Sequence, residues 1–243
     1  MKLIIICFSF IFLYGFDSFE KNYYKLSPEE QREIFFNKMN EMFDNSFENI
    51  LKEREFAQNF INEGAKTGFR NLDINGLKKL IELKNKYRIN NLFNLDEYEK
   101  KINLIPKSMG IAQALVESAT ATSRFAREAN NLFGEWTWGE KGLIPNERQE
   151  GKKHKIRIFD SLQESVDSYI LNLNRHFAYE DFRSLRQSCF IQGKNITGIK
   201  AIENLHSYSE NKNAYIGIIK KIIEKYELEK YDTLKTQSPF IKR

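Results

Sequence analysis

Glu117 is the residue of this sequence whose surroundings best suit acid–base chemistry. It follows an almost continuous apolar run, Met109–Val116, which predicts a helix buried inside a folded domain. A carboxyl at the end of such a helix loses water, and desolvation raises its pKa toward the range in which a general acid works near neutral pH. A solvated surface residue is the commoner outcome for a glutamate. The placement nevertheless makes Glu117 the first candidate for a proton donor.

A second carboxyl group is commonly needed when an enzyme cleaves a glycosidic bond, as a base, a nucleophile or a stabiliser of the transition state. Three glutamates that follow Trp138 are candidates for that role: Glu140, Glu147 and Glu150. Each of them equally fits a solvated turn residue. The residues alone leave the second acid open.

Metal and nucleic-acid chemistry are not favoured by the sequence. The three histidines lie far apart and lack the spacing of zinc ligands. The sequence contains no phosphate-binding glycine loop and no run of basic and aromatic residues typical of a nucleic-acid reader. The formal net charge of +5 suits any polyanion, including a cell-wall polymer, so it limits the partners without choosing one.

The first 18 residues have the layout of a secretory signal peptide, with Lys2 followed by the apolar run Leu3–Leu13. That run is shorter than the roughly 20 residues of a membrane-spanning helix, and an uncleaved N-terminal anchor is the alternative. We therefore expect export to the periplasm or cell envelope. If Cys7 leaves with the signal, Cys189 is the only thiol and no intrachain disulfide forms.

Residues 19–95 are predicted to form a helical extension. Ser27–Glu30 has the pattern of a capping box with proline at the first helical position, and apolar residues then recur at three- and four-residue steps as far as Leu51. Further helical stretches are predicted around Phe56–Ile61 and from Asp73. We expect helical hairpins whose apolar stripes pack against the next domain, against each other or against a partner protein.

The segment after Glu117 is predicted to change from helix to strand and back. Ser123 is expected to cap a short helix that ends at Ala129, and the following pair of asparagines fits a left-handed turn. Strand-like sequence at 133–138 and 155–159 predicts a small antiparallel hairpin or lobe. Helices are predicted again from about residue 160 to 226, with breaks near Gly193 and Ser207.

Several blocks of residues carry a compound pattern along about residues 100–226. In chain order they are Ile105-Pro106, Gln113–Ser118, Ser123–Ala126, Asn130–Gly134 with Trp136, Phe159–Ser161, Glu164–Val166 with Tyr169, Leu173-Asn174 with His176 and Tyr179, and Tyr208-Ser209 with Tyr215. This order resembles the glucosaminidase domain of glycoside hydrolase family 73, and most closely its Bax-type bacterial members. Any one of these blocks would be weak evidence for the family, whereas the whole series in this order is specific to it.

The resemblance implies a mostly helical, lysozyme-like α+β fold with a small β-hairpin lobe. It places the glucosaminidase domain at residues 96–228, between the helical extension and a tail at 229–243. It also implies cleavage of the bond after N-acetylglucosamine in the glycan strands of peptidoglycan, with Glu117 as proton donor. No metal or organic cofactor is expected for this activity.

The resemblance also suggests further site residues. Glu150 is the preferred second carboxylate because it precedes Gly151 in a pattern like that of the Bax-type members, whereas Glu147 fits better if flagellar-type members are the guide. Tyr208 matches a tyrosine near the end of the domain, and its hydroxyl would bind the sugar or steady an intermediate. Four residues are assigned to substrate binding: Trp136, Trp138, Asn131 and Phe133. For the two tryptophans, core packing is the alternative.

One departure from the family lies directly after the expected acid. Where the family usually has Gly-Trp-Gly, this chain has Ala119–Ala121, so an aromatic surface for packing or sugar stacking is missing. This puts the sugar preference in doubt more than the acid itself. Two alternatives to a glucosaminidase therefore stay open: a lytic transglycosylase, and a noncatalytic module that binds the cell wall.

Overall fold

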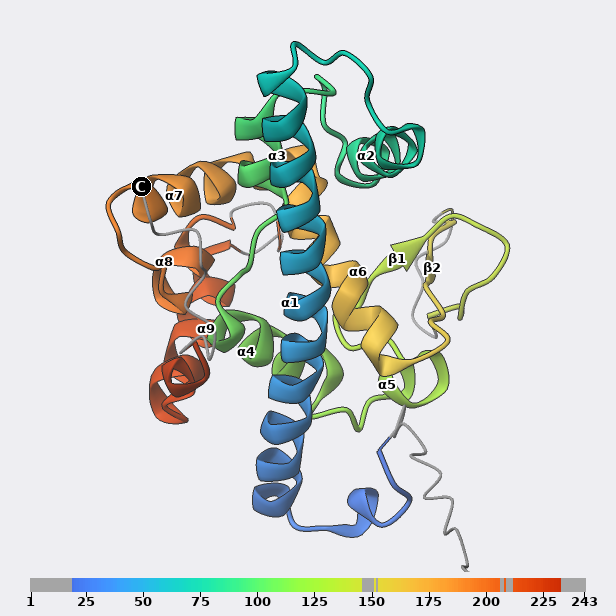
Figure 1. Ribbon diagram of the computed structural model, residues 1–243. Coiled ribbons are helices and arrows are strands. Elements are labelled where there is room, and N and C mark those ends of the chain that lie inside the picture. The colour runs from blue at the N-terminus through green and yellow to red at the C-terminus, as the bar shows by residue number, and fades with distance from the viewer. Residues whose placement is uncertain (1–18, 146–150, 152, 206–207, 209–211, 233–243) are drawn as a thin grey trace, which may run out of the picture.

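The computed structural model describes residues 19–145, 151, 153–205, 208 and 212–232. The predicted signal peptide at 1–18 and the tail beyond residue 232 lie outside the described residues. The elements in chain order are η1 (Tyr23–Lys25), α1 (Pro28–Lys66), α2 (Ile74–Tyr87), α3 (Leu95–Lys101), α4 (Lys107–Ser118), α5 (Arg124–Ala129), β1 (Trp136–Thr137), β2 (Lys155–Ile156), α6 (Leu162–Arg175), η2 (Phe177–Tyr179), α7 (Glu180–Ile191), α8 (Gly198–Glu203), α9 (Lys212–Lys225) and η3 (Leu228–Tyr231). The predicted fold class, mostly helical α+β with a small lobe, is confirmed (Figure 1).

Helix α1 crosses the height of the molecule as one helix of 39 residues (Figure 1). Its start is the predicted capping box, in which the Ser27 side chain accepts from the backbone of Glu30 and the Glu30 carboxylate accepts in return. The prediction of separate helical stretches up to Leu51 and around Phe56–Ile61 was wrong. The four residues between them, Lys-Glu-Arg-Glu, are all good helix formers and include no glycine or proline to end the helix.

The apolar stripe of α1 is buried against the rest of this chain. The helix packs on α3, α4 and α6, and Phe35, Phe43 and Phe47 belong to the same continuous core as the residues of α4 and α6. Gly110 on α4 lets the Phe43 ring approach so closely that a Cβ at that position would lie 2.3 Å from the ring. The extension is therefore part of the scaffold that holds α4.

The lobe is smaller than the sequence predicts. Strands β1 and β2 pair antiparallel with Trp136 opposite Ile156, and Leu143 adds an isolated bridge to Ile156. The first strand does not start at residue 133, because Gly134 adopts a positive φ of 66° that an extended strand does not contain. Residues 133–135 instead form a loop.

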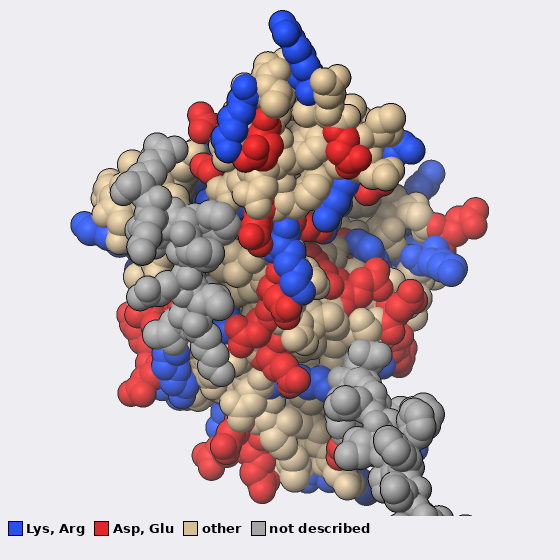
Figure 2. All heavy atoms as spheres, in the orientation of Figure 1, with Lys and Arg blue, Asp and Glu red and all other residues tan. Residues whose placement is uncertain are grey.

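The surface carries charges of both signs. On the face shown in Figure 2, lysine and arginine are interspersed with aspartate and glutamate, so the net charge of +5 forms no single basic stripe there. Among the described residues, no helix is long and apolar enough to cross a membrane.

Candidate active site

Glu117 lies in the last turn of the buried helix α4, as predicted. Its side chain is half-buried, and burial raises the pKa of its carboxyl, while a hydrogen bond from Tyr215 opposes the shift. The Tyr215 hydroxyl, on α9, donates to Glu117 Oε1 over 2.9 Å. Burial also raises the pKa of Tyr215, so the phenol stays neutral and acts as a donor. This arrangement favours a carboxylic acid that keeps its proton to a higher pH than a solvated glutamate.

Gln113 connects this pair to the core. It is one helical turn before Glu117, so both side chains lie on one face of α4. Its Nε2 donates to the Tyr215 hydroxyl over 3.2 Å, and its Oε1 accepts from the Tyr169 hydroxyl at 2.6 Å. Because Gln113 is fully buried, an amide with both ends satisfied is the low-energy state there. The chain of hydrogen bonds from Tyr169 to Glu117 therefore holds the acid in one rotamer.

The other carboxyl oxygen of Glu117 faces Gly134. A Cβ added to Gly134 would lie 3.6 Å from Glu117 Oε2, and the positive φ of Gly134 also favours glycine. Its neighbour Phe133 stacks on Tyr169 with 3.9 Å between the ring centroids and 4° between the planes. Glu117 thus has one oxygen held by Tyr215 and one beside a position without a side chain.

A left-handed loop follows Glu117. Ala119, Thr120 and Ala121 have φ values of 50°, 59° and 58°, and each such residue costs about 1–2 kcal/mol relative to a right-handed one. The loop is held by Ser118, whose Oγ accepts from the amide of Ala121 at 2.8 Å. The Tyr23 hydroxyl, from the N-terminal segment, donates to the carbonyl of Thr120 over 2.6 Å. Glycine, which the family usually has at the first and third of these positions, would adopt the same turns without this cost.

The candidates for the second carboxylate are not tested by the structure. Glu150 and Glu147 lie outside the described residues, and Glu140 is exposed in the lobe. A further carboxylate, Glu135, was missed by the sequence reasoning. It forms an ion pair with Arg157 Nη1 inside the lobe and accepts a hydrogen bond from the Ser168 hydroxyl on α6, both at 2.7 Å, so it anchors the lobe to α6.

Tyr208 lies in the same aromatic cluster as the acid. Its ring stacks on Tyr215 with 5.6 Å between the centroids and meets Tyr169 edge-on at 6.4 Å. The hydroxyl that contacts Glu117 is nevertheless that of Tyr215, which the sequence reasoning did not assign to the site. The signal that was available is the block in which Tyr215 follows Tyr208-Ser209. The role of Tyr208 stays a prediction.

The sequence pattern of one protein family, glucosaminidase, described as mannosyl-glycoprotein endo-beta-N-acetylglucosaminidase, matches residues 90–228. The chain belongs to this glucosaminidase family. It is also similar to protein bax of Escherichia coli strain K12, with 36% identity over 116 residues, which are 48% of this chain and 41% of that protein. The chain thus matches less than half of that relative's length. No solved structure matches.

Family membership confirms the resemblance to Bax-type glucosaminidase domains. It points to a glycosidase in general, with a glycan as the kind of substrate. Within the part of the chain that the structure describes, no group of three or more histidine, cysteine, aspartate or glutamate residues is placed to hold a metal ion.

The two tryptophans of the glucosaminidase domain are on the surface of the lobe. Trp136 is 49% exposed and Trp138 is 75% exposed, so neither is a core residue. One face of the Trp136 indole stacks on His154 with 4.1 Å between the ring centroids. The opposite face of the indole does not contact His154. An exposed indole offers the apolar face that a sugar ring stacks on, and this role stays a prediction.

The other two residues assigned to substrate have structural contacts instead. Asn131 is 1% exposed, and its side chain donates to the carbonyls of Glu135 and Arg157 and accepts from the amide of Glu135. Phe133 is buried against Tyr169. Both residues therefore fix the loop that carries Gly134, and we do not propose them further as sugar contacts.

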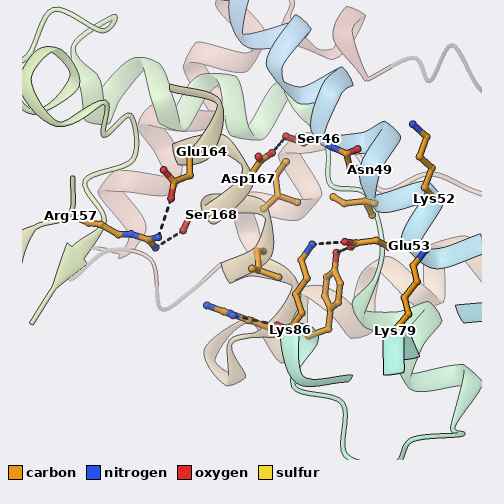
Figure 3. A pocket seen from close by; sticks show the side chains of 15 residues that line it. Ser46, Asn49, Lys52, Glu53, Lys79, Lys86, Arg157, Glu164, Asp167 and Ser168 are labelled. Carbon is orange, nitrogen blue, oxygen red and sulfur yellow. Dashed lines mark hydrogen bonds and ion pairs between the residues drawn. The ribbon is translucent and has the colours of Figure 1, made fainter. Parts of the chain in front are cut away.

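A cavity of about 550 Å³ lies elsewhere, between α1, α2 and α6. Figure 3 shows that its charged side chains have partners within each part, Glu53 with Lys86 in the extension and Arg157 with Glu164 in the domain. The Ser46 hydroxyl on α1 donates to Asp167 on α6 across the seam between the two parts. None of the residues that contact Glu117 lines this cavity. The cavity is therefore separate from the surroundings of Glu117.

Proposed function

We propose that the protein is an endo-β-N-acetylglucosaminidase that cleaves peptidoglycan, with Glu117 as the general acid. The observation that carries the proposal is the half-buried Glu117, whose pKa burial raises and whose Oε1 is held by Tyr215. A desolvated carboxyl of this kind remains protonated at a pH where solvated glutamates have ionised. The family to which the chain belongs supports a glycosidase as the enzyme class.

In this mechanism Glu117 Oε2 carries the proton. Since Oε1 accepts from Tyr215, it acts as the carbonyl oxygen of the acid, and the O–H group is on the side of Gly134. Transfer of that proton to the glycosidic oxygen lets the bond to the anomeric carbon break as an oxocarbenium-like state forms. Tyr215 then stabilises the carboxylate left on Glu117.

Two routes complete the reaction, and both consume one water. In the first, a lobe carboxylate, with Glu150 preferred, takes a proton from water as the water attacks the anomeric carbon. In the second, the carbonyl oxygen of the substrate's own N-acetyl group attacks first, and water opens the resulting ring with Glu117 as the base. The stereochemistry of the product distinguishes inversion from retention.

The proposed place of action is the cell envelope, after export through the N-terminal signal. The substrate is then the glycan strand of peptidoglycan, a polymer that suits a basic protein. Fractionation of cells that express the full chain tests this part of the proposal, because the protein should be found with the periplasm or envelope.

Digestion of purified peptidoglycan, followed by mass spectrometry of the released sugars, tests the activity. We expect products that end in reducing N-acetylglucosamine from the wild type and none from Glu117→Gln. A lytic transglycosylase is the nearest rival, because it could also use a single acid in the cleft. An anhydro sugar among the products would identify it. Tight binding to peptidoglycan with no release, unchanged in Glu117→Gln, would identify a noncatalytic wall-binding module, which the altered loop Ala119–Ala121 favours.

A further inference from the structure

The segment that precedes α1 touches the active-site loop directly. Tyr23 is buried, and its ring packs on Phe19 with 4.2 Å between the centroids. The Gln31 side chain on α1 donates to the carbonyl of Tyr23 over 3.0 Å, which fixes this residue at the start of the long helix. The Tyr23 hydroxyl then reaches across 97 residues of sequence to the carbonyl of Thr120 at 2.6 Å, which is closer than its other acceptor, the carbonyl of Gln31 at 3.2 Å.

The loop that receives this bond is the strained one that follows Glu117. Thr120 is the middle of three consecutive non-glycine residues with positive φ, and its carbonyl is three residues after the acid. Thr120 also donates its amide to the carbonyl of Leu115 on α4 over 3.0 Å. The loop is thus held from α4 on one side and from the extension on the other.

A second contact joins the same segment to the next helix. The guanidinium of Arg127 on α5 lies over the ring of Tyr24 at 4.8 Å from its centroid. Because α5 begins three residues after the strained loop, the N-terminal segment contacts both the middle of the loop and the helix that follows it. Relaxation of the loop would release the last turn of α4, which carries Glu117.

We propose that Tyr23 is a positioning residue for Glu117: the hydrogen bond from its hydroxyl to the Thr120 carbonyl holds the left-handed loop that fixes the end of α4. The expected effect of Tyr23 on catalysis rests on the proposed function. Through this hydrogen bond the helical extension contributes to the geometry of the active site. Its effect passes through the loop, and Tyr23 itself touches no substrate.

The test compares Tyr23→Phe with Tyr24→Phe in the full chain. Both remove one hydroxyl from adjacent residues. For Tyr23→Phe we expect kcat on peptidoglycan to fall about tenfold, equivalent to about 1.4 kcal/mol, with KM little changed, and the amides of Ala121 and Ser123 to exchange hydrogen about tenfold faster. Tyr24→Phe keeps the ring that lies under Arg127 and should match the wild type in all three measurements.

Ala119→Gly is the rescue variant. Ala119 is exposed and left-handed, so glycine relieves the strain there without loss of a buried side chain. Added to Tyr23→Phe, it should restore most of kcat and of the amide protection. If Tyr23→Phe alone does not fold, the double variant compared with Ala119→Gly alone carries the same test.

Wild-type kcat and wild-type exchange rates in Tyr23→Phe, with only a lower Tm, would overturn the proposal and leave Tyr23 as a simple packing residue. A wild type that does not hydrolyse peptidoglycan would refute the proposed function. Hydrogen exchange would then still decide whether Tyr23 holds the loop, so the two failures are distinguishable.

Discussion

The two sides of the candidate active site are built in different ways. On the helical side, Glu117, Gln113 and Tyr215 are joined by hydrogen bonds among buried or half-buried side chains. On the lobe side, β1 and β2 have two residues each, and Trp136 and Trp138 are exposed. Glu135 and Arg157 of the lobe are joined to α6 through Ser168 and Glu164.

The acid is therefore positioned by the core, whereas the lobe is positioned by a few surface contacts. A buried hydrogen-bond network permits one arrangement because each unpaired group would be costly. Exposed rings lose little when they move. We therefore expect substitutions on the helical side to change the rate and those on the lobe to change substrate affinity.

The largest effect is expected for Glu117→Gln. The amide cannot transfer the proton but still accepts from Tyr215, so the fold is kept while kcat falls by roughly 10²–10⁴-fold, the range for a lost general acid. Glu203→Gln, an exposed glutamate paired with Lys220, is the matched control. Release of reducing sugar ends and Tm are measured for both variants, and retained activity in Glu117→Gln would show that Glu117 is not the general acid.

Tyr215→Phe should have the next largest effect, on the order of tenfold in kcat/KM from one lost hydrogen bond. That bond lowers the pKa of Glu117 against the effect of burial, so its removal raises the pKa further. Because the mechanism needs protonated Glu117, activity is lost as pH rises through this pKa. The alkaline limb of the pH–rate profile should therefore move to higher pH, and a limb that stays in place or moves to lower pH would contradict this.

Gly134→Ala tests the contact between the two sides. The positive φ should cost about 1–2 kcal/mol, a fall in Tm of roughly 2–8 °C for a chain of this size. The new methyl would lie in van der Waals contact with Glu117 Oε2 at 3.6 Å and should lower kcat by taking space that the glycosidic oxygen needs beside the acid. Gly193→Ala has the same kind of φ, +68°, with open space around it. Equal losses of Tm, with loss of kcat in Gly134→Ala alone, are expected; equal kcat values would show that Gly134 matters only for the backbone.

Trp136→Ala and Trp138→Ala should have the smallest effects. Both indoles are exposed, so we expect little change in Tm. If they stack on sugar rings, KM should rise about threefold to tenfold, equivalent to about 0.5–1.5 kcal/mol for a ring contact, with kcat unchanged. An unchanged KM in both variants, measured on the same glycan, would remove the lobe from the binding surface.

The sequence predicted the features that depend on neighbouring residues. The caps at Ser27 and Ser123 and the left-handed Asn130 were found from local pattern and are confirmed. Glu117 was found because its own helix is apolar. Tyr215 was not assigned, because its contact with Glu117 joins residues 98 positions apart and only the packing of α9 beside α4 creates it.

The extension illustrates the same limit. Its apolar stripe was visible in the sequence, but the surface that covers it was not, since a stripe shows only which face is buried. The four charged residues after Leu51 interrupt the stripe without ending the helix, which is why one helix was predicted as two. The hydrogen bond from Tyr23 to Thr120 had no signal in the sequence.

Titration of Glu117 tests its assignment as the general acid. The carboxyl carbons of ¹³C-labelled glutamate are followed by NMR over pH, with Glu117→Gln to assign the signal, beside kcat/KM on peptidoglycan over the same range. We expect Glu117 to titrate above the usual value of about 4.3 for glutamate and kcat/KM to fall on the alkaline side at the same pH. A Glu117 signal with an ordinary pKa, or activity that passes unchanged through its titration, would contradict Glu117 as the general acid.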